Sequence, residues 1–94
     1  MPEEGSVRVV VEGRVQGVGF RAWTRRLGRK SGIRGWVANR PDGAVEIHAG
    51  GEEARLTRFL EAVRQGPSTA RVREVREMGE AGELPPSGFE IRHI

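Results

Sequence analysis

Residues 13–21, GRVQGVGFR, combine three glycines with Arg21 at the end of the segment. The segment joins a β-branched run to a helical pattern. A junction of this kind points several free backbone N–H groups at one spot, beside the positive end of a helix dipole. The Arg21 guanidinium can bond two oxygens of one phosphate. The pattern fits an anion cradle, and it fits equally well a tight turn followed by a solvated arginine. Its spacing matches neither a Walker A loop nor a dinucleotide-binding loop.

Asn39 is the second residue of chemical interest, because it is the only asparagine in the chain and stands before the turn at residues 40–43, RPDG. Its carboxamide can both donate and accept hydrogen bonds. Asparagine is also common where a turn begins, so a structural and a chemical role both stay open here. The histidines, His48 and His93, fall on a strand and near the C-terminus. We expect both to have ordinary surface or half-buried roles.

Hydrophobic periodicity predicts the elements that position these residues. We expect strands over residues 7–12, 33–39, 44–49 and 70–78, a helix over 21–31, a second helix from Glu52 and Glu53 to Gly66-Pro67, and a last strand through Phe89, Ile91 and His93. The order strand, helix, strand, strand, helix, strand is that of an α+β, ferredoxin-like split βαβ fold. Both helices then cover one face of an antiparallel sheet, and a short extra C-terminal strand follows.

Two details of the pattern make finer predictions. Phe20, Trp23 and Leu27 recur at helical spacing, so we expect them to form the apolar stripe of the first helix. Val72 and Val75 are an odd number of residues apart and share a face of a strand only if a bulge intervenes. We therefore expect an irregularity near Arg73 and Glu74.

The composition limits the class of protein. A chain of 94 residues fits one domain, here residues 1–94, with a flexible N-terminus over 1–6 and a loop over 79–88. The absence of cysteine excludes disulfides, thiolate metal ligands and cysteine nucleophiles. No apolar run approaches the roughly 20 residues that span a bilayer, and residues 1–6 are acidic and polar, unlike a signal peptide. We expect a cytoplasmic protein whose mature chain starts near Met1.

Lys30 is the only lysine among 16 basic residues, and the formal net charge is +3. Arginine favours bidentate contacts with phosphate or carboxylate, so an anionic partner fits this composition. A genome whose codon usage favours arginine explains this composition better than an anionic partner does.

At this point two motifs resemble those of the acylphosphatase family: GRVQGVGFR at 13–21 and GWVANRPDG at 35–43. The length, the element order and the closing FEI at 89–91 also agree, so the resemblance covers essentially the whole chain. The resemblance implies that Arg21 binds the substrate phosphate and that Asn39 orients the attacking water. It also implies that backbone amides wrap the phosphate oxygens, here those of Gln16, Gly17, Val18, Gly19 and Phe20. Many members carry a bulkier residue where this chain has Gly19, which predicts a more mobile loop.

The implied activity is hydrolysis of the carboxyl–phosphate bond of a small acyl phosphate, with no cofactor and no metal. We expect no nucleic-acid partner and no membrane. We also expect a monomer, because the chain is small and has no obvious apolar surface stripe. Two binding modules are the alternatives. An RNA-binding ferredoxin-like module would expose aromatic side chains on its central strands, whereas residues 43–48 read GAVEIH and the first strand carries only valines. A non-catalytic acylphosphatase-like module shares the motifs, and the sequence leaves it open.

Overall fold

The first strand is built from β-branched valines, whose side chains suit a half-buried pleated surface. The computed structural model describes residues 3–94. In it, Val7, Val9 and Val11 of β1 (Glu4–Arg14) belong to the hydrophobic core. The strand starts earlier than predicted, because residues 4–6 pair with residues 50–52 of β3 (Val45–Glu52). The expected flexible N-terminus is therefore wrong for residues 4–6, while Met1 and Pro2 lie outside the described residues.

The remaining elements follow the predicted order: α1 (Phe20–Ser31), β2 (Arg34–Asn39), α2 (Glu53–Gln65), β4 (Arg71–Glu77) and β5 (Phe89–Ile91). β3 runs three residues past its expected end, since its last residues pair with the start of β1. β5 ends at Ile91, so His93 lies beyond the strand in which it was expected. Within residues 3–94, no helix combines the length and the hydropathy needed to cross a membrane.

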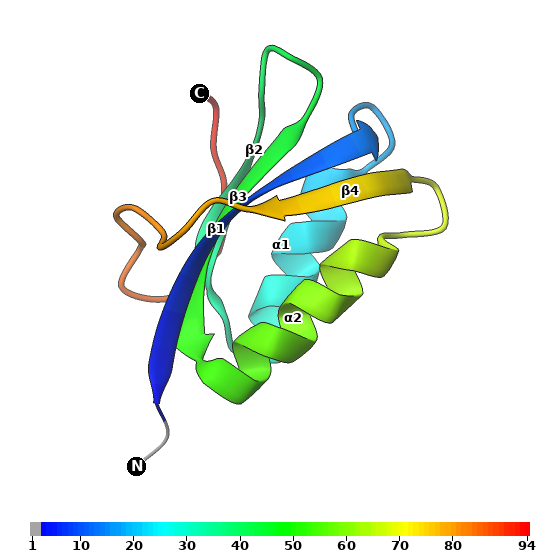
Figure 1. Cartoon of the computed structure of the whole chain (residues 1–94). Helices are drawn as coiled ribbons and strands as arrows, with labels where there is room; N and C mark the ends of the chain where they lie inside the picture. Colours follow the sequence, from blue (N-terminus) through cyan, green and yellow to red (C-terminus); the bar gives the residue numbers. More distant parts are fainter. Residues whose placement is uncertain (1–2) are drawn as a thin grey trace.

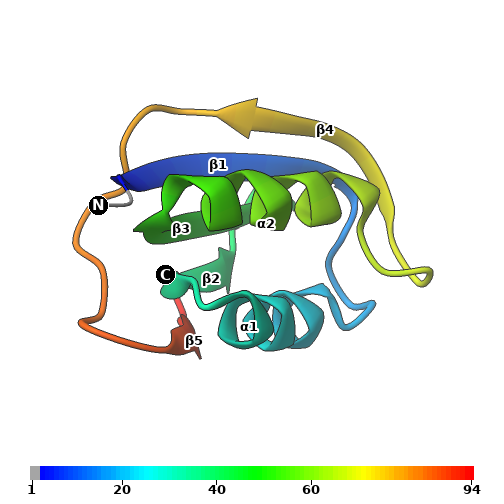
Figure 2. The same cartoon turned by 90° about the horizontal axis from the view of Figure 1, so that it is seen from below.

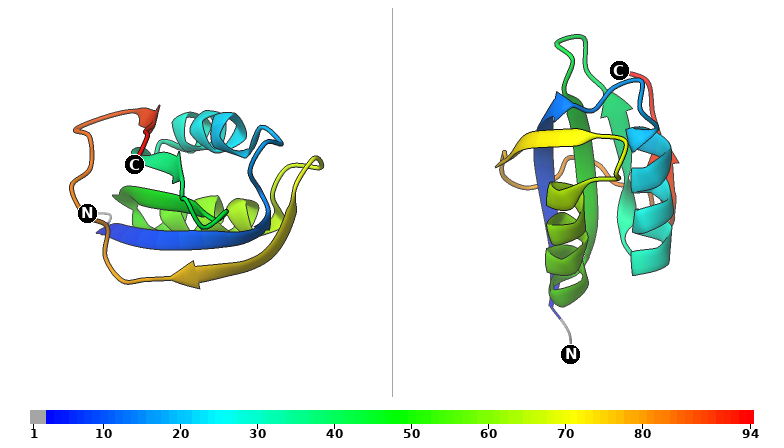
Figure 3. Two further views of the ribbon diagram at one scale, coloured as in Figure 1. Left: turned by 90° about the horizontal axis from the view of Figure 1, so that it is seen from above. Right: turned by 90° about the vertical axis from the view of Figure 1, so that its right-hand side faces the viewer.

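The strands form one sheet in the order β4-β1-β3-β2-β5. β1 runs antiparallel to β3 and β4, and β2 runs antiparallel to β3. β5 is parallel to β2, so the extra strand makes the sheet mixed. Both helices lie side by side on one face, as Figures 1 and 3 show. The predicted ferredoxin-like split βαβ architecture with an appended C-terminal strand is confirmed.

A β-bulge interrupts β4 at the predicted place. Glu12 of β1 pairs with Glu74 and Gly13 pairs with Val72, so Arg73 is left without an opposite residue. Gly13 has φ +133°, and a Cβ there would lie 2.1 Å from the carbonyl oxygen of Arg71. Only glycine fits such a close approach of two backbones. The bulge lets Val72 and Val75 both pack against the core.

The core fills the space between the sheet and the helices. On α2 the predicted stripe is buried: Leu56, Phe59, Leu60 and Val63. On α1 the fully buried line is Phe20, Thr24 and Gly28, whereas Trp23 and Leu27 are only partly buried at its side. Thr24 tolerates burial because its hydroxyl donates to the carbonyl oxygen of Phe20 at 2.8 Å. Gly28 leaves room for the ring of Phe89 from β5.

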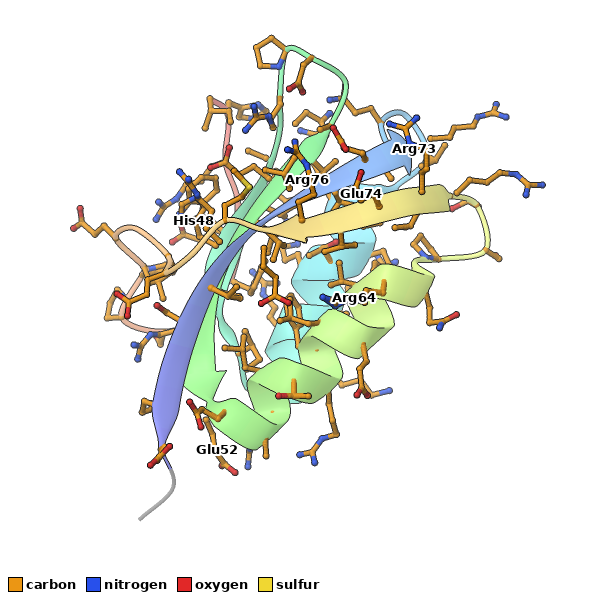
Figure 4. All side chains as sticks on the ribbon, viewed as in Figure 1. His48, Glu52, Arg64, Arg73, Glu74 and Arg76 are labelled. Carbon is orange, nitrogen blue, oxygen red and sulfur yellow. The ribbon has the colours of Figure 1, made fainter. Side chains whose placement is uncertain are left out.

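The face of the sheet away from the helices carries a polar cluster. The ring of His48 stacks on Trp36 with centroids 4.1 Å apart. Its Nδ1 accepts from the Gly82 N–H at 3.0 Å, so Nε2 carries the proton and donates to Glu46 at 2.7 Å. His48 is 6% exposed, so its expected surface or half-buried role is wrong. Residues 78–88, which run from β4 to β5 in Figure 2, cover the ring of His48 through Gly82. Figure 4 labels His48 beside this segment.

Candidate functional site

The loop between β1 and α1 owes its shape to two glycines. Gly17 has φ +74° and Gly19 has φ +81°, both in the left-handed region. A Cβ at either position would meet no atom within 4 Å, so backbone conformation rather than space selects glycine. Most other residues there would cost about 1–2 kcal/mol, and asparagine or aspartate less. Gly19 is also the N-cap of α1, and its carbonyl oxygen accepts from the Trp23 N–H at 3.0 Å.

A hollow of about 360 Å³ lies where this loop enters α1. The loop and the first turn of the helix form one wall of it: Val15, Gly17, Gly19, Phe20, Arg21 and Ala22. The first turn of α1 has no acidic residue, so the positive end of its dipole is not neutralised there. Four of the predicted site residues, Gly17, Gly19, Phe20 and Arg21, thus line one hollow. Gln16 and Val18, predicted with them, do not line it.

Asn39, the last residue of β2, lines the hollow from the opposite side. Figure 1 shows that the β2–β3 turn, the β1–α1 loop and the C-terminus gather at the same end of the sheet. The Oδ1 atom of Asn39 is buried and has no hydrogen-bond partner within residues 3–94. A buried acceptor without a donor costs about 1–3 kcal/mol, so each such atom needs an explanation. The Nε atoms of Arg8 and Arg25 are also buried without a partner in the described part of the chain. The end of β2 thus carries one polar atom whose hydrogen bonding the described residues do not satisfy.

Arg21 is half-buried and forms no ion pair with a carboxylate of the part of the chain that the structure describes. Arg40, the residue directly after Asn39, differs from Arg21 because it forms ion pairs with Asp42 at 3.1 Å and with Glu46 at 2.9 Å. The Arg40 charge is thus compensated by its own neighbours. No carboxylate of residues 3–94 compensates the charge of Arg21 in this way.

The C-terminus supplies two residues that the sequence analysis did not place at the site. Ile91 and His93 both line the hollow, and His93 is exposed at its rim. They reach it because β5 runs parallel to β2 and ends beside the end of β2 that carries Asn39. The alternation of residues 89, 91 and 93 predicts that they share one side of a strand. Nothing in the local sequence predicts which element that side contacts.

The pKa values beside the site are set by the β2–β3 turn. The backbone N–H of Ala44, which donates to Asp42 at 3.0 Å, lowers the pKa of Asp42, with a further contribution from Arg40. Burial raises the pKa of Glu46, but hydrogen bonds from His48 and Arg40 outweigh it, and the pKa is lowered. Both carboxylates therefore stay ionised at neutral pH, and they fix the turn that follows Asn39.

A larger hollow of about 520 Å³ lies between β1 and α2, but its lining suits an anion poorly. Three carboxylates line it, those of Glu53, Glu77 and Glu80, and no basic residue does. The hollow at the loop has the opposite character, since no carboxylate lines it and Arg21 does. Of these two hollows, only the one at the loop is suited to a phosphate group.

Comparison with known proteins assigns the chain to a family. The family model described as Acylphosphatase matches residues 7–91. The chain belongs to the acylphosphatase family. An acylphosphatase of Archaeoglobus fulgidus is 54% identical over 70 residues, which cover 74% of this chain and 79% of that protein. The crystal structure of an acylphosphatase from Bacillus subtilis matches with a TM-score of 0.84 and 40% identity, covering 96% of this chain and 99% of that one.

A second kind of relative is much longer. The crystal structure of HypF from T. kodakarensis matches with a TM-score of 0.78 and 29% identity, covering 98% of this chain but only 12% of HypF. The fold and the identities over most of the chain place this protein among the acylphosphatases, which are hydrolases. The resemblance stated on the two motifs is thereby confirmed.

Proposed function

We propose that this chain hydrolyses the carboxyl–phosphate bond of small acyl phosphates, with Arg21 holding the phosphate and Asn39 orienting the attacking water. The observation that carries the proposal is that Arg21, which forms no ion pair within residues 3–94, and Asn39 line one hollow where the loop enters α1. The backbone N–H groups of residues 16–20 contribute the remaining phosphate contacts, as the loop at the N-terminus of α1 favours.

The reaction requires little covalent chemistry from the protein itself. The water oxygen forms a bond to phosphorus while the bond from phosphorus to the acyl oxygen breaks, and the carboxylate leaves without needing a proton at neutral pH. The water's proton passes to the phosphate. Because the transition state is loose, the protein chiefly positions the charged oxygens and aligns the nucleophile opposite the leaving oxygen.

Asn39 suits the second of these tasks. Its Oδ1 accepts a hydrogen bond from the water, and its amide NH₂ can donate to an oxygen nearby. A water held by its proton directs a lone pair away from the amide and toward the phosphorus. Arg21 supplies charge and a planar fork that fixes the phosphate in one orientation.

The proposal extends to the working form of the protein. We infer a single domain that acts as a cytoplasmic monomer, without metal or cofactor, and whose partner is the small acyl phosphate rather than a nucleic acid. The contacts named above all address the phosphate, so acetyl, carbamoyl and aryl acyl phosphates should all be accepted.

An assay with benzoyl phosphate, with and without EDTA, tests the proposal directly. We expect turnover in both conditions, and ¹⁸O from labelled water should appear in the phosphate and not in the benzoate. Label in the benzoate would mean attack at the acyl carbon, and loss of activity in EDTA would mean a metal-dependent reaction. Phosphate binding without turnover would instead identify a non-catalytic binding module.

The variant Asn39→Ala separates water orientation from phosphate binding. We expect kcat to fall by about 100-fold or more, as for the loss of one preorganised donor or acceptor in other active sites. The inhibition constant of inorganic phosphate should change little. Equal losses in kcat and in phosphate affinity would show that Asn39 has only a structural role in the turn.

A further inference from the structure

Gln16 has a side-chain contact that its predicted role does not use. Its Nε2 donates one hydrogen bond to the carbonyl oxygen of Arg40 at 2.8 Å and another to that of Ala44 at 2.9 Å. These two residues close the β2–β3 turn, since the Arg40 N–H also donates to the Ala44 carbonyl oxygen at 2.8 Å. The Gln16 amide therefore lies at the open end of the turn and binds residues that are 24 and 28 positions further along the chain.

The orientation of this amide is fixed by its acceptors. Both partners are carbonyl oxygens, which can only accept, so the NH₂ group must face them and uses both of its hydrogens. With the amide flipped, Oε1 would face two carbonyl oxygens without any donor between them. Gln16 therefore has one amide orientation, in which its side chain joins the β1–α1 loop to the β2–β3 turn.

The turn is important because Asn39 immediately precedes Arg40. A second side chain also binds the β1–α1 loop: the Thr69 hydroxyl donates a hydrogen bond to the carbonyl oxygen of Val18 at 2.8 Å. That bond leads to the segment before β4 and not to the turn. The Gln16 side chain, by contrast, connects the β1–α1 loop to the turn that follows Asn39 at the end of β2.

We infer that Gln16 is a positioning residue, an inference that rests on the proposed function. Its side chain fixes the distance between the amides that hold the phosphate and the carboxamide that orients the water. It thereby sets the alignment of the nucleophile, and it acts through Asn39 rather than through phosphate affinity.

Kinetics of Gln16→Met test the inference, because methionine keeps the length of the side chain and removes both donors. We expect kcat to fall by about 10- to 100-fold, since a displacement of about 1 Å at a reacting group costs up to about 100-fold. The phosphate inhibition constant should stay within about threefold of the wild-type value. Gln16→Glu should be at least as impaired, because it sets a carboxylate against two carbonyl oxygens. Thr69→Val, which loses the hydrogen bond to Val18, is the matched control and should keep kcat.

The double variant Gln16→Met/Asn39→Ala distinguishes positioning from general damage. If Gln16 acts through Asn39, the double variant should have the same kcat as Asn39→Ala alone. Fully additive losses, a kcat of Gln16→Met within about twofold of wild type, or a weakened phosphate inhibition that accounts for the whole loss would overturn the inference. Thermal unfolding of each variant shows whether the comparison is between folded proteins.

NMR of the side-chain amides gives a readout that needs no turnover. The chain has one asparagine and two glutamines, Gln16 and Gln65, so three NH₂ pairs report directly on these side chains. We expect the Asn39 pair to shift or broaden in Gln16→Met and in Gln16→Glu, and to stay in place in Thr69→Val. An unchanged Asn39 pair refutes the positioning role. An inactive wild type with a shifted pair would instead refute the proposed function and leave the coupling of Gln16 to Asn39 standing.

Discussion

Replacing Gly28 by alanine sets two opposing effects against each other. Alanine favours the helix over glycine by about 1 kcal/mol. However, a Cβ at residue 28 would lie 2.3 Å from Cδ2, 2.6 Å from Cγ and 2.9 Å from Cε2 of the Phe89 ring. Favourable carbon contacts lie at about 3.5–4.0 Å, so the ring must move. Phe89 is 1% exposed, so in a close-packed core its ring moves only by displacing other buried atoms.

The expected net effect follows from the two magnitudes. Overpacking a well-packed core costs about 1–3 kcal/mol, and three ring atoms in conflict place this site in the upper half of that range. After the gain in helix propensity, we expect a loss of about 1–2 kcal/mol in the free energy of unfolding. For a domain of this size that corresponds to a fall in Tm of about 4–16 °C.

Thermal and urea unfolding followed by circular dichroism measure the effect, and Phe89→Leu provides the matched background. In that background the clash is relieved, so Gly28→Ala should cost less or even stabilise. A higher Tm for the single Gly28→Ala variant would refute the argument, because it would mean that the helix propensity outweighs the packing. Because β5 carries Phe89 and also Ile91 of the site, the single variant should weaken phosphate inhibition as well.

Three further predictions concern charge. Arg21→Lys should lose most of kcat/KM and of phosphate inhibition, because lysine cannot reproduce the bidentate fork; near-normal turnover would exclude the assigned role. The lowered pKa of Glu46 means that its ionised form stabilises the fold at neutral pH, a contribution that is lost as the pH falls into the acid range below about 4.3, the ordinary pKa of a glutamate. The stability of Glu46→Gln, measured by urea unfolding across that range, should depend less on pH than that of the wild type, and identical slopes would contradict the assignment. Finally, kcat/KM should fall as salt is added, because α1 carries five basic residues and no carboxylate; a rate independent of ionic strength would argue against attraction of the substrate by this helix.

Much of the fold is predictable from local sequence pattern. The alternating and periodic apolar residues predict the order of elements, and the odd spacing of Val72 and Val75 predicts the bulge that the structure places at Arg73. The burial of Thr24 and Gly28 is not predictable in this way, because hydrophobicity alone favours Trp23 and Leu27. Thr24 is buried through a hydrogen bond within its own helix, and Gly28 through a ring that arrives from β5.

The site shows the same division between local and distant information. The motif resemblance indicates Arg21 and Asn39, and the structure brings both to one hollow. The contacts of His48, Gln16 and His93 depend on partners far away in sequence. Gly82 covers His48, the turn at residues 40–44 binds Gln16, and parallel pairing of β5 carries His93 to the rim. No periodicity within a single element contains that information.

The bulge in β4 has a consequence for how the protein behaves at high concentration. β4 forms one border of the sheet, where unsatisfied backbone groups can template the addition of a foreign strand. Here an incoming chain would meet the irregular backbone at Arg73 and a row of charged side chains, of which Figure 4 labels Arg73, Glu74 and Arg76. The opposite border, β5, offers only three residues. Both borders are thus poor templates, which guards this sheet against fibril-like self-association.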